Sequence, residues 1–151
     1  MDLKILNKKA VKEILALIKK QWEAASVELN YAFLRGKDNK LFIINKDFVK
    51  VPLEKLRINK IGLYFGQLLV NELRLSIEGS QLVGPNARKN ILNITEDQSK
   101  AWLRGEDLET EEKFSGFVLI RYSNDFLGTG KYREGKIFNF IPKGRRLKTS
   151  E

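Results

Sequence analysis

The chain has 151 residues, of which 42% are hydrophobic and 31% charged, a composition typical of a folded globular protein. It contains neither cysteine nor histidine, which excludes disulfide bonds, Cys or His metal sites, a Ser-His-Asp triad and a cysteine nucleophile within these residues. Lys and Arg outnumber Asp and Glu by 28 to 19, and the formal charge of +9 favours an acidic partner such as nucleic acid. No apolar run is long enough to span a bilayer and no signal-like segment begins the chain, so we expect a soluble, cytoplasmic protein.

The first half of the chain predicts one helix followed by an antiparallel meander. Apolar residues at helical spacing predict an amphipathic helix over residues 8–24, with Asn7 as its cap. Strands are predicted, with turn-forming residues between several of them, over residues 27–33, 41–44, 48–51, 61–66 and 73–77. Residues 52–56 predict one helical turn, because proline suits a helix start. Gly84-Pro85-Asn86 breaks the chain, and we place a domain boundary near residue 88.

The second half predicts a short helix among strands. A strand over residues 91–94 precedes Thr95 and Gln98, which have the spacing of a capping box for a helix over residues 96–104 that ends at Gly105. After an acidic loop over residues 106–112, the apolar run 117–120 predicts a strand buried on both faces. A hairpin turn over residues 133–136 joins residues 130–132 to residues 137–141.

The most informative stretch for function is residues 131–148, here called the C-terminal basic segment. It contains a single acid, Glu134, and seven cations: Lys131, Arg133, Lys136, Lys143, Arg145, Arg146 and Lys148. Tyr132, Phe138 and Phe140 are interleaved with them. RNA binding requires cations for phosphates and flat rings for unpaired bases, so this segment favours an RNA contact. Phe138 and Phe140 equally suit one core-facing side of a strand, which leaves Tyr132 as the stacking candidate.

Two other motifs do not predict a cofactor or metal site. Gly128-Thr129-Gly130 begins like a dinucleotide fingerprint, but Arg133 occupies the position of its last glycine and no strand-to-helix context follows. We expect these glycines to permit a tight backbone path instead. The acidic residues of the loop at 106–112 match no calcium-binding spacing, and a solvated loop is expected there.

The second half of the chain resembles a PUA domain, the small RNA-binding barrel of pseudouridine synthases and archaeosine transglycosylases. The resemblance rests on Trp102-Leu103-Arg104-Gly105 at the helix end, on the strand Gly116-Phe117-Val118-Leu119-Ile120, and on Asp125-Phe126-Leu127-Gly128-Thr129-Gly130 as a glycine-bearing turn into the next strand. PUA domains usually follow the Arg-Gly with a small apolar residue and later have a Pro-Gly turn, whereas Glu106-Asp107-Leu108 follows here. The resemblance therefore implies RNA contact through the basic C-terminal strands more than through the Gly105 loop.

The rest of the chain extends the resemblance in two directions. The helix, the meander, residues 61–66 and residues 73–77 resemble the pre-PUA domain of Nip-type ribosome biogenesis factors. The closing run over residues 130–147, with Ile141-Pro142-Lys143-Gly144-Arg145-Arg146, is similar to the C-terminal RNA-binding region of Nol/Nop/Sun-type RNA cytosine methyltransferases. Such an enzyme needs a cysteine nucleophile and a cofactor-binding α/β domain, and neither occurs in these residues.

Taken together, these observations predict an α+β protein. Residues 1–88 would form an N-terminal α/β domain of a helix and an antiparallel meander, and residues 89–151 a small PUA-like β-barrel. We expect it to bind structured RNA, ribosomal RNA above all and tRNA as the alternative, as a non-catalytic ribosome-assembly or processing factor. A targeting subunit or stand-alone relative of the C-terminal region of an RNA cytosine methyltransferase is the rival function. A protein-interaction module with incidental charge is a third possibility.

The expected site contains no catalytic, cofactor-binding or metal-binding residue. The predicted phosphate contacts are Lys131, Arg133, Lys136, Arg145 and Arg146, with Lys143 and Lys148 in a secondary role and Tyr132 stacking on a base. Expected protein partners are ribosome-assembly proteins or an RNA methyltransferase, and no membrane is expected.

Overall fold

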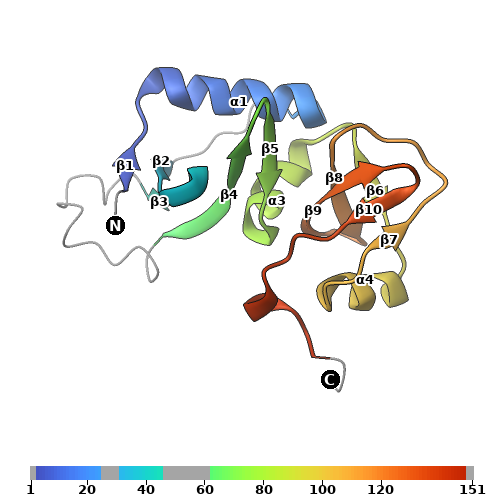
Figure 1. Ribbon diagram of the computed structural model, residues 1–151. Helices are drawn as coiled ribbons and strands as arrows, with labels where there is room; N and C mark the ends of the chain where they lie inside the picture. The colour runs from blue at the N-terminus through green and yellow to red at the C-terminus, as the bar shows by residue number, and fades with distance from the viewer. Residues whose placement is uncertain (1–2, 25–30, 46–61, 149–151) are drawn as a thin grey trace.

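The computed structural model describes residues 3–24, 31–45 and 62–148, which form two five-stranded sheets and three α-helices. Figure 1 shows the first sheet and helix α1 on one side of the molecule, the second sheet and helix α4 on the other, and α3 between them. The mixture of helices and sheets confirms the predicted α+β class. The predicted strand at 48–51 and the helical turn at 52–56 lie outside the described residues. Within the described ranges, no helix is long and apolar enough to cross a membrane.

The first sheet is antiparallel throughout, and its strands lie side by side in chain order. These strands are β1 (Lys4–Ile5), β2 (Tyr31–Arg35), β3 (Lys40–Asn45), β4 (Leu63–Leu69) and β5 (Glu72–Leu75). A short 3₁₀ helix, η1 (Lys37–Asn39), joins β2 to β3. Helix α1 (Lys8–Trp22) begins at Asn7, whose side chain accepts a hydrogen bond from the Ala10 N–H, and buries Ile14, Ile18 and Trp22. The helix prediction is confirmed except for its last residues, because Glu23 adopts a left-handed conformation and ends the helix.

Helix α3 (Ile77–Val83) was not predicted, and the strand predicted at 73–77 runs two residues past the end of β5. Ser76 causes the change, because its Oγ accepts a hydrogen bond from the Gly79 N–H and caps the helix. A side chain at Gly79 would collide with the Phe65 carbonyl, since a Cβ there would lie 2.1 Å from its oxygen. A capping serine and a packing requirement, rather than an apolar period, therefore define this helix. A 3₁₀ helix, η4 (Gly84–Asn86), follows it at the predicted chain break.

The second sheet has the strand order β6-β8-β9-β10-β7, with β6 and β8 parallel and the other pairs antiparallel. Its strands are β6 (Ile91–Asn93), β7 (Leu108–Glu109), β8 (Phe117–Tyr122), β9 (Asp125–Arg133) and β10 (Lys136–Phe138). Helix α4 (Glu96–Leu103) has the predicted capping box of Thr95 and Gln98. After the last strand comes the 3₁₀ helix η5 (Lys143–Arg145).

Two sequence expectations for the second half need correction. The acidic loop contains strand β7, because Leu108 is buried and pairs with Ile137 of β10. The glycine-bearing segment 125–130 is not a turn but the first part of β9, which pairs with β8 from Tyr122 onward. Gly130 is required there by packing, since a Cβ would lie 2.4 Å from the Ile137 side chain and 2.6 Å from that of Trp102.

Strand β8 joins the two halves, because its two faces belong to different apolar clusters. Phe117 and Leu119 pack into the first cluster with Trp22 of α1 and with buried residues of the first sheet. Val118 and Ile120 pack into the second cluster with Trp102. The strand is buried on both faces, as its uniformly apolar sequence predicted. The indole N–H of Trp22 also donates to the Phe117 carbonyl at 3.0 Å, so the first helix is tied directly to this strand.

Candidate nucleic-acid interface

The β9–β10 hairpin carries four of the predicted site residues, and three of them, Lys131, Arg133 and Lys136, lie on one of its faces. Its turn consists of Glu134 and Gly135, both with positive φ, as a two-residue hairpin turn of type I′ requires. Arg133 pairs directly with Lys136 and Lys131 with Phe138. Side chains alternate along a strand and match across it, so Phe138 shares this face of the hairpin with the three cations.

The opposite face of the hairpin belongs to the core. Tyr132 pairs with Ile137, which is fully buried, and its own ring is half-buried in the second apolar cluster. The Tyr132 ring meets Phe114 edge to face, with 5.9 Å between ring centres. The predicted stacking residue therefore lies away from the predicted cations. Phe138 is half-buried on the cation face, with the Lys136 ammonium 5.8 Å from its ring centre.

Lys131 connects the two sheets. Its ammonium lies 2.5 Å from a Glu72 carboxylate oxygen of β5 and 5.0 Å from the centre of the Phe117 ring. The Lys131 ammonium thus contacts both an acid of the first sheet and an aromatic ring of the second.

The tail after β10 uses two more predicted cations for internal contacts. Arg145 forms an ion pair with Glu78 of α3. The Arg146 Nε donates to the Ile141 carbonyl at 2.8 Å, and its side chain lies against Gly105, where a Cβ would approach the Arg146 Cδ to 2.5 Å. The Leu147 N–H donates to the Leu103 carbonyl at 2.8 Å. The tail is therefore docked on the end of α4, and the Gly105 loop and the basic tail, which are far apart in sequence, form one surface.

Two acids of the loop after α4, Glu106 and Asp107, also form contacts within the protein. Glu106 pairs with Arg104 at 2.9 Å, and a carboxylate oxygen of Asp107 accepts the Asn139 N–H at 2.8 Å. Nowhere in the described ranges do three or more acidic side chains gather in a way that could hold a metal ion.

Four of the predicted cations remain exposed, and their side chains form no hydrogen bond or ion pair with any described residue: Arg133, Lys136, Lys143 and Lys148. Two lie at the tip of the hairpin and two along the tail. The structure thus divides the predicted patch into three cations that hold protein groups and four that are available to a ligand.

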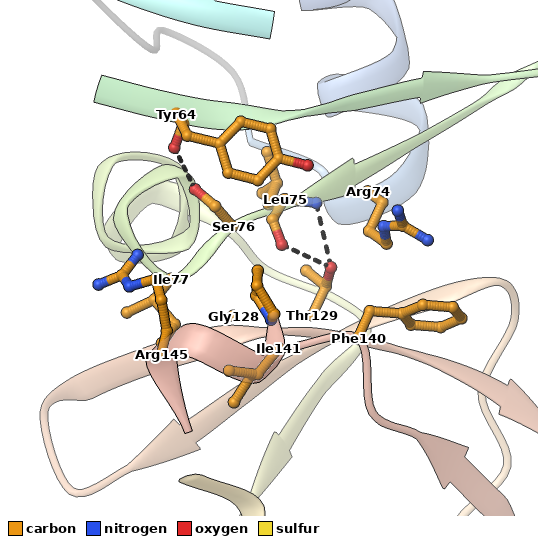
Figure 2. Close-up of a pocket in the computed structure, with 11 residues that line it drawn as sticks. Tyr64, Arg74, Leu75, Ser76, Ile77, Gly128, Thr129, Phe140, Ile141 and Arg145 are labelled. Carbon is orange, nitrogen blue, oxygen red and sulfur yellow. Dashed lines mark hydrogen bonds between the residues drawn. The ribbon is translucent and has the colours of Figure 1, made fainter. Parts of the chain in front are cut away.

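A narrow pocket lies where the two sheets meet (Figure 2). Its wall includes the Thr129 hydroxyl, which lies 3.1 Å from both the amide nitrogen and the carbonyl oxygen of Leu75. The Arg74 guanidinium lies 4.4 Å from the centre of the exposed Phe140 ring. Burial raises the pKa of the nearby Tyr64 hydroxyl, and Arg74 opposes that rise. The cavity volume is about 30 Å³, which is enough for a water molecule but too small for a nucleotide base. We therefore interpret this pocket as part of the packing contact between the two halves and not as a binding site.

Comparison with known proteins identifies relatives of both halves. Residues 89–147 match the family described as the methyltransferase RsmF PUA domain. The chain is 26% identical over 111 residues to ribosomal RNA small subunit methyltransferase F of Vibrio vulnificus, covering 74% of this chain and 23% of that protein. It is 24% identical over 145 residues to the protein of the same name in Vibrio parahaemolyticus, covering 90% of this chain and 30% of that one. The chain thus spans about a quarter of the length of the curated relatives it matches.

Proposed function

The chain carries a PUA domain related to the C-terminal region of the RNA cytosine methyltransferases, and we propose that it binds ribosomal RNA and presents it to such an enzyme. The observation that carries this proposal is the exposed face of the β9–β10 hairpin. There Arg133 and Lys136 lie directly opposite each other, and neither forms an ion pair with a described residue. Glu109 of β7 is the cross-strand neighbour of Lys136 on its other side. The like charges of Arg133 and Lys136 repel, Glu109 offsets part of that repulsion at Lys136, and a phosphate bound between the two cations would remove the rest.

The same face supplies the second requirement of RNA binding. The half-buried Phe138 ring lies on the cation side of the hairpin and offers a surface for an unpaired base. Lys143 and Lys148 extend the positive surface along the tail. The relatives are named for the RNA of the small ribosomal subunit, which favours ribosomal RNA over tRNA as the ligand and the cytoplasm as its location.

In this proposal these 151 residues bind RNA and do not transfer the methyl group. They contain no cysteine, the nucleophile that cytosine methylation requires in the enzymes the chain resembles. Incubation with small-subunit RNA and methyl donor should therefore yield no methylated cytosine, and stoichiometric methylation by the chain alone would contradict this.

A second candidate function is a ribosome-assembly factor that uses the same cationic face without any enzyme. Two of the available cations, Lys143 and Lys148, lie on the tail rather than in the β-sheet, and they suit contact with folded ribosomal RNA as well as delivery to an enzyme. Copurification separates the two functions. A methyltransferase in the purified complex supports targeting, whereas assembling ribosomal subunits without one support assembly.

The test of RNA binding uses a transcript of bacterial small-subunit ribosomal RNA and a series of salt concentrations. The double variant Arg133→Ala/Lys136→Ala should weaken binding and reduce the slope of log affinity against log salt by about 1.5 to 2. Lys12→Ala/Lys19→Ala, on the exposed face of α1, removes the same charge and should have a much smaller effect. Equal losses for the two pairs would show that the charge acts diffusely and would contradict the proposed face.

A further inference from the structure

We propose that the first sheet carries a second RNA-binding surface, a groove that holds the phosphate backbone of the same RNA; this inference rests on the proposed function. The groove has a volume of about 740 Å³. It is called the basic groove below, and it is lined by Leu3, Lys4, Arg35, Gly36, Lys37, Asp38, Asn39, Lys40 and Phe42.

The fold brings the four cations of the basic groove together from separate elements. Strand β1 supplies Lys4, and its register places that residue directly opposite Arg35 of β2. The chain then turns through η1, which contributes Lys37, and returns as β3, which begins at Lys40. Two left-handed residues, Asp38 and Asn39, make this tight reversal possible.

The charges of the basic groove are not compensated within the described part of the chain. All four cations are exposed, and none of their side chains forms an ion pair or a hydrogen bond with a described residue. The groove contains one acid, Asp38, against these four cations. Like charges directly opposite on neighbouring strands destabilise a sheet, so the Lys4–Arg35 pair costs folding energy that a polyanion in the groove would offset. The unfavourable Lys4–Arg35 pair lines the groove, which indicates that the groove binds a ligand rich in negative charge.

The shape of this surface favours a nucleic acid over a lipid headgroup layer. A membrane surface is flat, whereas these cations line a concavity into which a phosphate chain can be laid. The aromatic ring of Phe42 also lines the groove and is half-buried, with its centre 5.7 Å from that of Tyr64. A base beside the bound backbone would therefore meet an aromatic face.

The basic groove and the hairpin lie at opposite ends of the molecule. In Figure 1 strands β1 and β3 lie at the left, near the N-terminus, and β9 and β10 at the right. An RNA that touches both must run along the length of the protein. Two weak contact regions on one rigid scaffold then act together and raise the overall affinity.

The test compares double variants of the full chain with the wild-type protein on a small-subunit ribosomal RNA transcript. Lys37→Ala/Lys40→Ala should lower the affinity about tenfold near 0.1 M salt and reduce the salt slope by about 1.5. Lys12→Ala/Lys19→Ala removes equal charge from the exposed face of α1 and should change affinity much less. Lys37→Arg/Lys40→Arg keeps the charge and should bind like wild type. All four substituted positions are exposed, and circular dichroism checks that each variant is folded.

Each remaining outcome has a distinct meaning. If the wild-type protein binds no ribosomal RNA, the proposed function fails and the groove proposal fails with it. If the wild-type protein binds but the groove variant binds equally well, the groove proposal alone is overturned. Equal losses in the groove and α1 variants also overturn it. A groove variant that loses binding to phosphatidylglycerol vesicles but not to RNA would assign the groove to a membrane surface instead.

Discussion

The two basic regions of this protein differ in how the fold uses their charge. In the C-terminal basic segment, Lys131 and Arg145 are paired with acids and Arg146 is hydrogen-bonded to the backbone. In the basic groove, none of the four cations has an acidic partner within the described ranges. The segment is the denser of the two in sequence, yet both regions offer four available cations. A run of cations in the sequence therefore overestimates the binding surface when the fold pairs some of them with acids. Cations that lie on several separate elements are underestimated, because only the fold brings them together.

The largest expected effect tests whether the two halves of the chain, each with one of the basic regions, form a single cooperative folding unit. A boundary near residue 88 predicts a second domain with its own core, which the second apolar cluster would supply. The isolated fragment 89–151 would, however, expose Phe117, Leu119 and Phe126, which pack into the first cluster. We expect the fragment to lose roughly 5 kcal/mol of stabilisation from these side chains, a large part of a domain's total. Urea denaturation measures this loss, and a fragment that unfolds cooperatively with a midpoint near that of the whole chain would contradict it.

The next effect tests whether the basic tail is docked. Gly105→Val should reduce the free energy of unfolding by about 2 to 4 kcal/mol, because Gly105 has φ +96° and a side chain there would collide with Arg146. Gly144→Ala is the matched control, since a Cβ at Gly144 would have no neighbour within 4 Å. If the two variants are equally stable in urea, Arg146 does not lie against the Gly105 loop. It would then count as a fifth cation of the C-terminal basic segment that is available to RNA.

A smaller effect is expected at the ion pair between the tail and α3. Arg145→Met should reduce the free energy of unfolding by about 1 kcal/mol, because it leaves a mostly buried Glu78 carboxylate without its partner. One oxygen of that carboxylate already has no hydrogen-bond partner among the described residues. The double variant Glu78→Gln/Arg145→Met should recover part of the loss, which thermal denaturation of the single and double variants can measure. Additive losses would mean that the two residues do not interact.

These contrasts explain which parts of the structure the sequence could predict. Local patterns were enough for α1, for the capping box of α4, for the buried strand β8 and for the hairpin turn, because each depends on residues close together in the chain. The family of the second half was also predictable from short motifs, and the match of residues 89–147 confirms a PUA domain related to the RNA cytosine methyltransferases. Helix α3 and strand β7 were missed because a serine cap and one pairing with β10 define them.

The division of the candidate site could not be predicted, because it depends on contacts between distant residues. Glu72 and Glu78 precede Lys131 and Arg145 by more than fifty residues, and no local pattern links them. The position of Tyr132 on the core face could have been found from its alternation with Lys131 and Arg133 along the strand. The groove cations come from four elements, β1, β2, η1 and β3, and the register of β1 with β2 is what brings Lys4 to the other three.

The smallest effect gives the sharpest separation between structural and available cations. Lys131→Met should reduce the free energy of unfolding by only about 0.5 to 1 kcal/mol, because the lysine side chain is about one-third exposed and its pairing with Glu72 is partly screened by solvent. Its effect on RNA affinity should be smaller than that of Arg133→Ala, its neighbour on the same face of β9. Because Lys131 already neutralises Glu72, it adds little positive potential for a phosphate. The slope of log affinity against log salt should therefore remain near the wild-type value. Measuring both variants at several salt concentrations decides the matter. If Lys131→Met lowers the slope as much as Arg133→Ala does, the ion pair between Lys131 and Glu72 opens when RNA binds. The seven RNA-binding cations predicted from the sequence would then describe the site better than the four assigned from the structure.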